Sequence, residues 1–126
     1  MIKKIILDTN FIMIPAQFKV DIYAELDKIC DFNYELYVLD RSLTELDTII
    51  KTQKGKEKAA ARLAKAILEA KKPKILKTTS KVYVDNILLG LKDFIVATQD
   101  HELRLKLKKE GVKTIVLRQK KYLMLD

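Results

Sequence analysis

The chain has 126 residues and a formal net charge of +8, and 48% of its residues are hydrophobic and 33% charged. This length favours one domain over residues 1–126, and the composition is typical of a packed globule. Cys30 and His101 are the only cysteine and histidine, which excludes disulfide frameworks, cysteine zinc sites and two-histidine metal motifs. Any bound metal must therefore be held mainly by oxygen atoms.

The N-terminus and the hydropathy of the chain bear on its location. The segment Met1–Asp8 meets charged residues too early to hold the apolar core of a secretory signal. No apolar run approaches the roughly 18 residues that a membrane-spanning helix needs. We therefore expect a cytoplasmic protein without a membrane partner.

Strand and helix patterns alternate along the chain. Residues 2–7 are apolar in a way that is typical of a strand covered on both faces. The expected elements are, in chain order, a strand at 2–7, a helix at 19–31, a strand at 35–39, a helix from 42 to a break at Gly55, a helix onward to Lys72, a strand at 75–78, a helix at 82–92, a strand at 94–97, a helix at 100–110, a strand at 114–117 and a short extended tail at 122–125. This alternation predicts an α/β fold, a single-domain three-layer α/β/α sandwich with a central, mainly parallel five-stranded sheet.

Four acidic residues follow the predicted strands, each in a different connection. Parallel strands end at one edge of the sheet, where α/β proteins form their sites, so these side chains should meet there. Clustered carboxylates repel one another unless a cation neutralises them, and Mg²⁺ or Mn²⁺ favours such oxygen ligands. The four acids are Asp8, Glu45, Asp85 and Asp100.

Each acid also has a structural explanation. Glu45 stands three residues after Ser42, which matches a helix capping box. Asp100 near a helix start can complement the helix dipole, and Asp85 can be an ordinary exposed helix residue. Asp8 is harder to explain in this way, because a charge at the end of a buried strand needs a partner.

Four short segments resemble the motifs of the PIN-domain family, in the order and with the spacing of that family. They are Asp8-Thr9-Asn10-Phe11-Ile12, Leu43-Thr44-Glu45-Leu46, Val84-Asp85-Asn86-Ile87-Leu88 and Val96-Ala97-Thr98-Gln99-Asp100. The pattern is most similar to small archaeal relatives of the eukaryotic rRNA-processing PIN nucleases, and more distantly to VapC toxins. One departure is Asn86, because those relatives often carry a second aspartate at this position.

The resemblance implies a metal-dependent endoribonuclease that hydrolyses RNA phosphodiester bonds, in rRNA or other RNA processing. The implied catalytic residues, which would also hold one or two Mg²⁺ or Mn²⁺ ions, are Asp8, Glu45, Asp85 and Asp100. The residues implied to orient these ligands, without binding the metal themselves, are Asn10, Asn86 and Thr98. If the metal ligand belongs at position 86, the site has an amide where a carboxylate is expected.

Positive charge is concentrated in two segments. Residues 51–77 carry ten Lys or Arg against two Glu, residues 104–121 carry eight against one, and the remainder is net acidic. The helix that ends near Lys72 is expected to bury an apolar stripe of Ala59, Leu63, Ala66, Ile67 and Ala70. The cations expected to bind RNA phosphates from its other side are Lys54, Lys58, Arg62 and Lys65. Solvated helix faces remain the alternative explanation for these charges.

Other functions stay open at this stage. A haloacid-dehalogenase-like phosphatase needs an aspartate at position 10, where the chain has Asn10, and a receiver domain needs an acidic pair beside Asp8. Asn86 keeps open a weak or inactive PIN-like RNA-binding module, and a VapC-type toxin ribonuclease shares the same motifs. The expected partner is RNA, and a homodimer, a ribosomal precursor or an antitoxin is left open.

Overall fold

The computed structural model describes residues 2–78 and 93–126. Its strands are β1 (Lys3–Leu7), β2 (Tyr34–Leu39), β3 (Lys74–Leu76), β4 (Phe94–Ala97), β5 (Thr114–Arg118) and β6 (Tyr122–Leu125). Its helices are α1 (Thr9–Ile12), α2 (Ile14–Phe18), α3 (Ile22–Ile29), α4 (Asp40–Thr52), α5 (Lys56–Lys71) and α7 (His101–Lys109). The helix expected over 82–92, with Asp85 and Asn86, lies outside the described residues. Within those described, no helix has both the length and the apolar character needed to cross a membrane.

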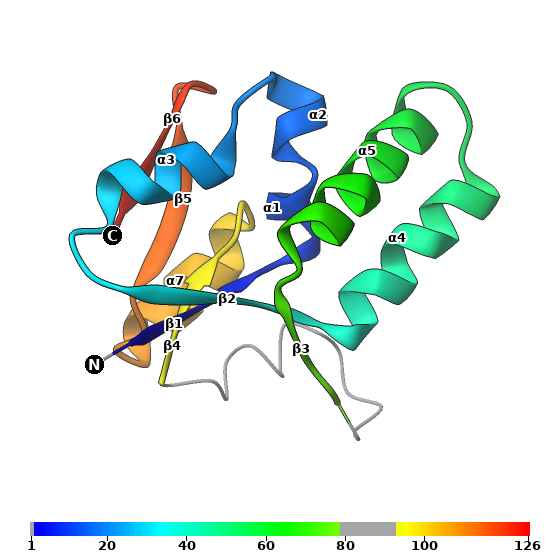
Figure 1. Ribbon diagram of the computed structural model, residues 1–126. Coiled ribbons are helices and arrows are strands. Elements are labelled where there is room, and N and C mark those ends of the chain that lie inside the picture. Colours follow the sequence, from blue (N-terminus) through cyan, green and yellow to red (C-terminus); the bar gives the residue numbers. More distant parts are fainter. Residues whose placement is uncertain (1, 79–92) are drawn as a thin grey trace.

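The strands form one six-stranded sheet in the order β3-β2-β1-β4-β5-β6 (Figure 1). The pairs from β3 to β5 are all parallel, as predicted, and β6 pairs antiparallel with β5. The expected number of five strands is therefore corrected to six. The tail at 122–125 was not recognised as a strand because Gln119 and Lys120, which form the turn before it, lack the Asn-Gly character of a tight hairpin.

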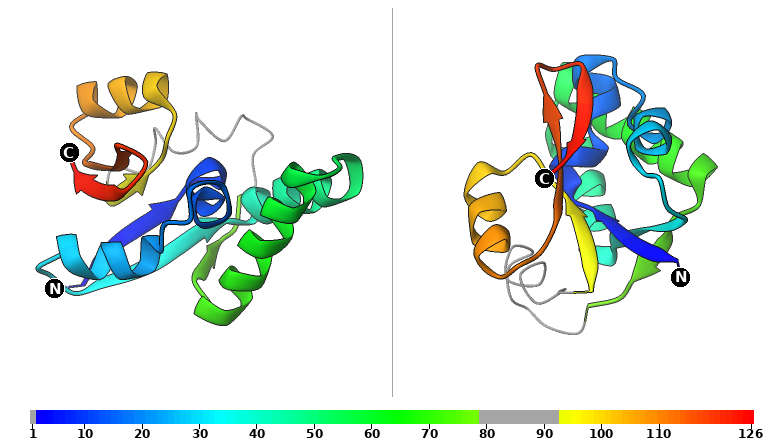
Figure 2. Two further views of the ribbon diagram at one scale, coloured as in Figure 1. Left: turned by 90° about the horizontal axis from the view of Figure 1, so that it is seen from above. Right: turned by 90° about the vertical axis from the view of Figure 1, so that its left-hand side faces the viewer.

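Both faces of the sheet are covered, which confirms the predicted three-layer α/β/α sandwich. On one face, Leu103 and Leu107 of α7 pack with Ile6 and Val96. The opposite face carries the larger core, to which α1 to α5 contribute Phe11, Ile14, Ile22, Leu26, Leu46 and Ala61. Figure 2 shows α7 on one side of the sheet and α3 and α5 on the other. The central strand β1 is consequently buried on both faces at its carboxyl end.

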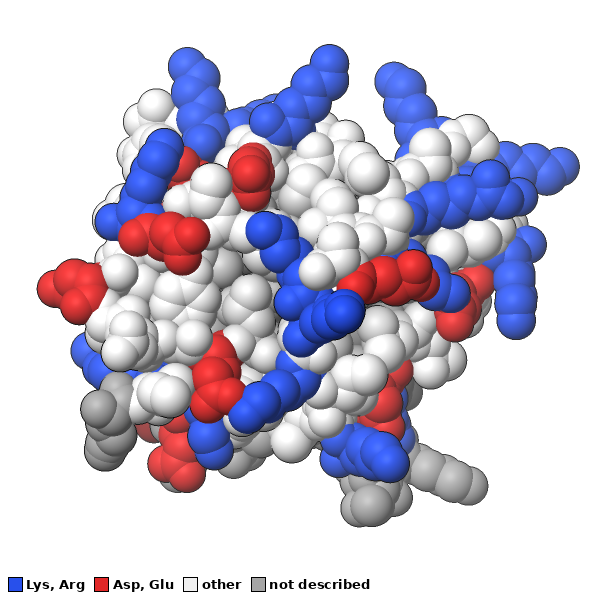
Figure 3. All heavy atoms as spheres, viewed as in Figure 1, with Lys and Arg blue, Asp and Glu red and all other residues white. Residues whose placement is uncertain are grey.

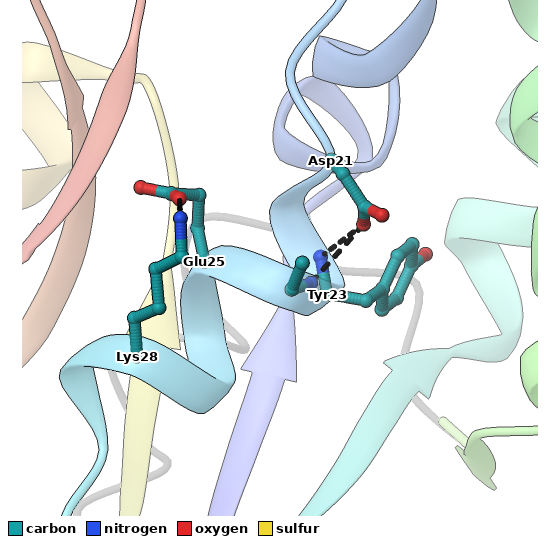
Figure 4. A network of polar contacts seen from close by, with 5 residues as sticks. Asp21, Tyr23, Glu25 and Lys28 are labelled. Atoms are coloured by element: carbon teal, nitrogen blue, oxygen red, sulfur yellow. Dashed lines mark hydrogen bonds and ion pairs between the residues drawn. The ribbon is translucent and has the colours of Figure 1, made fainter.

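The helix expected over 19–31 is shorter in the structure and begins at Ile22. Lys19 adopts a left-handed conformation (φ 57°) that ends α2. The Asp21 carboxylate then accepts hydrogen bonds from the amides of Tyr23 and Ala24, each 3.1 Å long, and so begins α3 (Figure 4). Burial, and to a smaller extent the charge of Asp21, raises the pKa of Tyr23 to about 12. The short helices α1 and α2 before this point were not predicted.

The apolar stripe predicted for α5 was wrong. Leu63 is 46% exposed, and Ala59, Ala66 and Ala70 are also exposed. The buried face of the helix consists of Ala60, Ala61, Ala64 and Leu68. The helix carries apolar residues on several sides, so its periodicity alone could not select a face. The packing of α5 on α4 and α2 selects the side that carries Ala60, Ala61, Ala64 and Leu68.

Candidate functional site

Asp8 lies directly after β1 and is only 7% exposed. Its Oδ1 accepts a hydrogen bond of 2.9 Å from the Thr9 amide, which places Asp8 at the N-cap of α1. Its Oδ2 accepts a 2.7 Å hydrogen bond from the Thr98 hydroxyl. A buried carboxylate is costly unless it is hydrogen-bonded. The hydrogen bonds from the Thr9 amide and the Thr98 hydroxyl offset part of this cost.

Thr98, directly after β4, joins two of the acids. Its side chain is fully buried. The hydroxyl donates to Asp8 and accepts a 3.2 Å hydrogen bond from the Asp100 amide. Asp100 is the N-cap of α7, where its Oδ1 accepts a 3.1 Å hydrogen bond from the Leu103 amide. Asp100 therefore caps a helix, as the structural explanation expected, and it is also tied to Asp8 through one hydroxyl.

Glu45 reaches the same cluster from α4. The Thr9 hydroxyl donates to Glu45 Oε1 over 3.0 Å and shares a 2.9 Å hydrogen bond with the Ser42 hydroxyl. The predicted capping box was wrong, because α4 begins at Asp40 and its N-cap, Leu39, has no side-chain hydrogen bond. Ser42 is fully buried within the first turn and holds Thr9 instead.

Asn10 links the start of α1 to the loop after β4. Its Oδ1 accepts a 3.0 Å hydrogen bond from the Gln99 amide and lies 3.4 Å from the Thr98 hydroxyl. The two residues implied to orient the acids, Asn10 and Thr98, thus contact each other beside Asp8. The third such residue, Asn86, and the fourth acid, Asp85, lie outside the described residues.

Asp40 is an acid at this edge that the sequence analysis missed. It follows β2 directly, as Asp8 follows β1, and this position was the available signal. Its carboxylate accepts hydrogen bonds from the Thr78 hydroxyl (2.8 Å) and the Thr78 amide (3.1 Å). These two bonds, the hydroxyl first, lower the pKa of Asp40. Asp40 therefore fixes the chain beyond β3 to the end of β2.

The acids at this edge offer oxygen atoms, which are the ligand type of a hard divalent cation. Carboxylates and hydroxyls are the ligand types that Mg²⁺ and Mn²⁺ prefer. Within residues 2–78 and 93–126, no three Asp, Glu, His or Cys side chains lie close enough together to hold a metal ion. Asp8 is instead linked to Glu45 through Thr9, whose amide donates to Asp8 and whose hydroxyl donates to Glu45. It is linked to Asp100 through the Thr98 hydroxyl, which donates to Asp8 and accepts from the Asp100 amide. The linked set, which we term the acid cluster, is Asp8, Glu45, Asp100, Thr9 and Thr98.

Comparison with known proteins places the chain in a family. Residues 5–120 match the family described as a PIN-like domain. The chain belongs to this family. The ribonuclease VapC4 of Methanocaldococcus jannaschii is 34% identical to it over 125 residues, covering 94% of this chain and 93% of that protein. The family resemblance inferred from the four motifs is thereby confirmed.

Two solved structures share the PIN-like fold. The PIN domain endonuclease Utp24 matches with a TM-score of 0.78 at 24% identity, over 98% of this chain and 90% of that one. A domain of a functionally unknown protein from Methanocaldococcus jannaschii matches with a TM-score of 0.59 at 15% identity, over 92% of this chain and 91% of that one. At these identities both matches support the fold alone.

The cations expected to bind RNA differ in their surroundings. Lys54 is exposed in the connection between α4 and α5, and Arg62 is exposed on α5 of this PIN-like domain. Lys58 is half-buried, and Lys65 donates a 2.7 Å hydrogen bond to Asp47 of α4. Figure 3 shows Lys and Arg gathered over the α4–α5 region. The ion pair of Lys65 leaves it less available to a phosphate than the others.

Proposed function

We propose that this PIN-like protein is a metal-dependent endoribonuclease that hydrolyses RNA phosphodiester bonds with one or two Mg²⁺ or Mn²⁺ ions. The observation that carries the proposal is the acid cluster. Asp8, Glu45 and Asp100 come from separate connections and lie at one sheet edge. The Thr98 hydroxyl donates to the Asp8 carboxylate and accepts from the Asp100 amide, and the Thr9 hydroxyl donates to the Glu45 carboxylate. The Asp8 side chain is buried. The 34% identical relative named ribonuclease VapC4 supports RNA as the substrate.

In this proposal Asp8, Glu45, Asp85 and Asp100 would hold the cation, directly or through water. A bound divalent ion supplies charge neutralisation at the scissile phosphate and lowers the pKa of a coordinated water. Thr98 orients the Asp8 carboxylate, and Thr9 orients that of Glu45, so each acid presents a fixed oxygen to the cation. Asn86 beside Asp85 can orient that acid but cannot replace it.

The proposed RNA path runs from the acid cluster towards α5. Lys54, Lys58 and Arg62 would bind phosphates there without base specificity, and Lys65 would contribute less. The expected setting is processing of rRNA or another cellular RNA in the cytoplasm, with ribosomal precursors as partners.

A second candidate function is a VapC-type toxin ribonuclease. The identity to ribonuclease VapC4 extends over nearly the whole of both chains and favours it. A toxin would pair with an antitoxin, and either protein could act as a homodimer. Induced expression distinguishes the two, because a toxin should arrest growth of its host in a way that a co-expressed antitoxin relieves. A processing enzyme should not need such a partner.

Cleavage of RNA tests the proposed activity directly. Purified protein should cleave single-stranded or loop RNA with Mg²⁺ or Mn²⁺, and EDTA should protect the RNA. Cleavage should produce internal breaks in a circular RNA, which an exonuclease cannot attack. Intact RNA across a range of Mn²⁺ concentrations would leave the weak or inactive RNA-binding module as the better conclusion.

A further inference from the structure

The turn between β5 and β6 has an uncommon backbone. The Lys121 amide donates a 3.0 Å hydrogen bond to the Arg118 carbonyl, which closes a two-residue turn. Both central residues have positive φ, 52° at Gln119 and 55° at Lys120. Hairpins of this type strongly favour Asn-Gly, because most side chains are strained in the left-handed region. Strained residues of this kind are concentrated at functional sites, where something other than stability retains them.

The turn projects beyond the sheet edge that carries the acid cluster. Ile115 of β5 is paired with Ala97, the last residue of β4, so β5 continues three residues further to Arg118. At about 3.3 Å per residue, the turn begins roughly 10 Å past the end of β4. In the strand order, the ends of β1 and β4 lie between this turn and the α4–α5 side of the sheet. The turn thus borders the acid cluster on the side away from α5.

Gln99 connects the turn to the acid cluster. Its side-chain Oε1 accepts a 3.1 Å hydrogen bond from the amide of Leu117, the residue before Arg118. Its own amide donates to Asn10 Oδ1 beside Asp8. One residue therefore fixes the end of β5 to the loop that carries Thr98 and Asp100.

The turn presents three cations that have no ion pair within residues 2–78 and 93–126. Arg118, Lys120 and Lys121 are all exposed, and none forms an ion pair with the described residues. Two other cations of the same basic segment, Arg104 and Lys108, do pair with Asp126. Lys120 Nζ lies 5.9 Å from the centre of the Phe18 ring, which places the turn beside α2 at the top of Figure 1. Lys and Arg side chains project from that region in Figure 3.

We propose that the β5–β6 turn binds phosphate groups of the RNA strand on the side of the acid cluster opposite α5. Arg118, Lys120 and Lys121 supply the charge, and Gln99 keeps the turn in register with the cluster. Phosphate contacts of this kind position a strand and do not select its sequence. The inference rests on the proposed ribonuclease function and assigns a second part of its substrate path.

A matched pair of variants tests the turn. Arg118→Gln, Lys120→Gln and Lys121→Gln are combined in one protein, and Lys106→Gln, Lys109→Gln and Lys113→Gln in another. Both sets remove three exposed cations from the same basic segment, but the second lies on α7 and at the opposite end of β5. Each set is placed in an Asp8→Asn background in EDTA, so that a fluorescent single-stranded RNA is bound and not cut.

The salt dependence of RNA affinity gives the result. Each phosphate contact contributes about 0.7 to the slope of log affinity against log salt for a single strand. The turn variant should lose up to about 2 from this slope and bind roughly tenfold more weakly at low salt, while the control variant keeps the parental slope. Equal slopes in the two variants would overturn the inference. Metal-dependent cleavage by the protein with Asp8 intact is measured separately and decides the proposed function on its own.

A second variant tests the turn even if the triple variant fails to fold. Gln119→Asn with Lys120→Gly supplies the favoured turn sequence and removes one cation. Its melting temperature should rise, because the backbone strain of the turn is relieved. Its RNA affinity should fall by the contribution of one phosphate contact. A higher melting temperature with unchanged affinity and slope would overturn the inference. Gln119→Asn alone should raise stability and keep affinity.

Discussion

The two edges of the sheet hold their charges in different ways. At the amino edge, where the parallel strands begin, Lys74 pairs with Glu35. Lys3 lies over the ring of Phe32 there, and Lys4 lies over the ring of Phe94. Charges there meet opposite charges or aromatic faces. At the carboxyl edge the acid cluster is held by hydroxyls and backbone amides.

This difference separates a structural use of charge from a functional one. Ion pairs neutralise charge, whereas hydroxyl and amide donors fix the orientation of a carboxylate. A bound cation would stabilise carboxylates that are brought near one another at this edge. The contrast between the two edges therefore supports the proposed cation site at the carboxyl edge.

The largest effect is expected for Asp8→Asn, which removes the buried charge and nearly keeps the shape. RNA cleavage should fall on the order of 100-fold or more. Melting temperature in EDTA should be unchanged or higher, because repulsion within the acid cluster decreases. Added Mn²⁺ should stabilise the original protein by about 2.7 kcal/mol at a hundredfold excess over Kd, and the variant should lose most of this gain. A variant less stable in EDTA with an equal metal response would contradict a shared metal site.

Thr98→Val should have the next largest effect. It retains the shape of a fully buried side chain but removes the hydroxyl between Asp8 and Asp100. We expect cleavage to fall about 10- to 100-fold and stability to fall by about 1–3 kcal/mol. Thr114→Val is the control, because Thr114 is also buried but lies at the start of β5, away from the acids. Equal losses in cleavage for the two variants would show that Thr98 only fills space.

Neutralising the cations near α5 should have a moderate effect on binding and little effect on folding. With Lys54, Lys58, Arg62 and Lys65 all changed to Gln, RNA affinity should weaken and its salt slope should flatten. Lys65→Gln alone should change the slope least, because this residue is already paired with Asp47. RNA affinity measured over a series of salt concentrations checks this prediction. An unchanged salt slope in the fourfold variant would mean that these cations only form a solvated helix face.

Asp40→Asn should act on the acid dependence of stability. The hydrogen bonds from Thr78 lower the pKa of Asp40 in the folded state. The contribution of Asp40 to folding stability is therefore fully present above its pKa in the unfolded chain, about 3.9. This contribution is lost as the pH falls through the lower pKa of Asp40 in the folded protein. The variant should be less stable near neutral pH and should lose less stability on acidification. Melting temperatures of both proteins, measured from neutral pH to below the pKa of Asp40, test this prediction. An equal loss of melting temperature on acidification in both proteins would disprove the role of Asp40.

The smallest effect is expected at the amino edge. Lys74→Gln breaks the ion pair with Glu35, but both partners are exposed enough for solvent to screen the pair. Melting temperature, metal response and RNA cleavage should all stay close to those of the original protein. A large loss of cleavage would break the proposed contrast between the two edges.

The mainly parallel sheet and the edge at which Asp8 and Asp100 lie could be predicted because they depend on local patterns. Residues 94–97 were predicted as a strand and form β4 with the same bounds. Asp8 and Asp100 follow the parallel strands β1 and β4, so the rule that such strands end at one edge places both acids together. Their connection through Thr98 is a long-range contact for which the sequence has no local signal.

The sequence alone determined the α/β alternation, the family and the sheet edge at which the acids gather. These features could be predicted because hydrophobic periodicity and turn residues are patterns of a few neighbouring positions. Only the tertiary structure decided which side of α5 is buried. The helix has apolar residues on several sides, and its packing on α4 and α2 buries the side of Ala61 and Leu68 and leaves Leu63 exposed. Tertiary contacts also turned Ser42 from an expected helix cap into a buried support for Thr9. They hold Lys120 in a left-handed turn that its own preference disfavours, because pairing of β6 with β5 requires that turn.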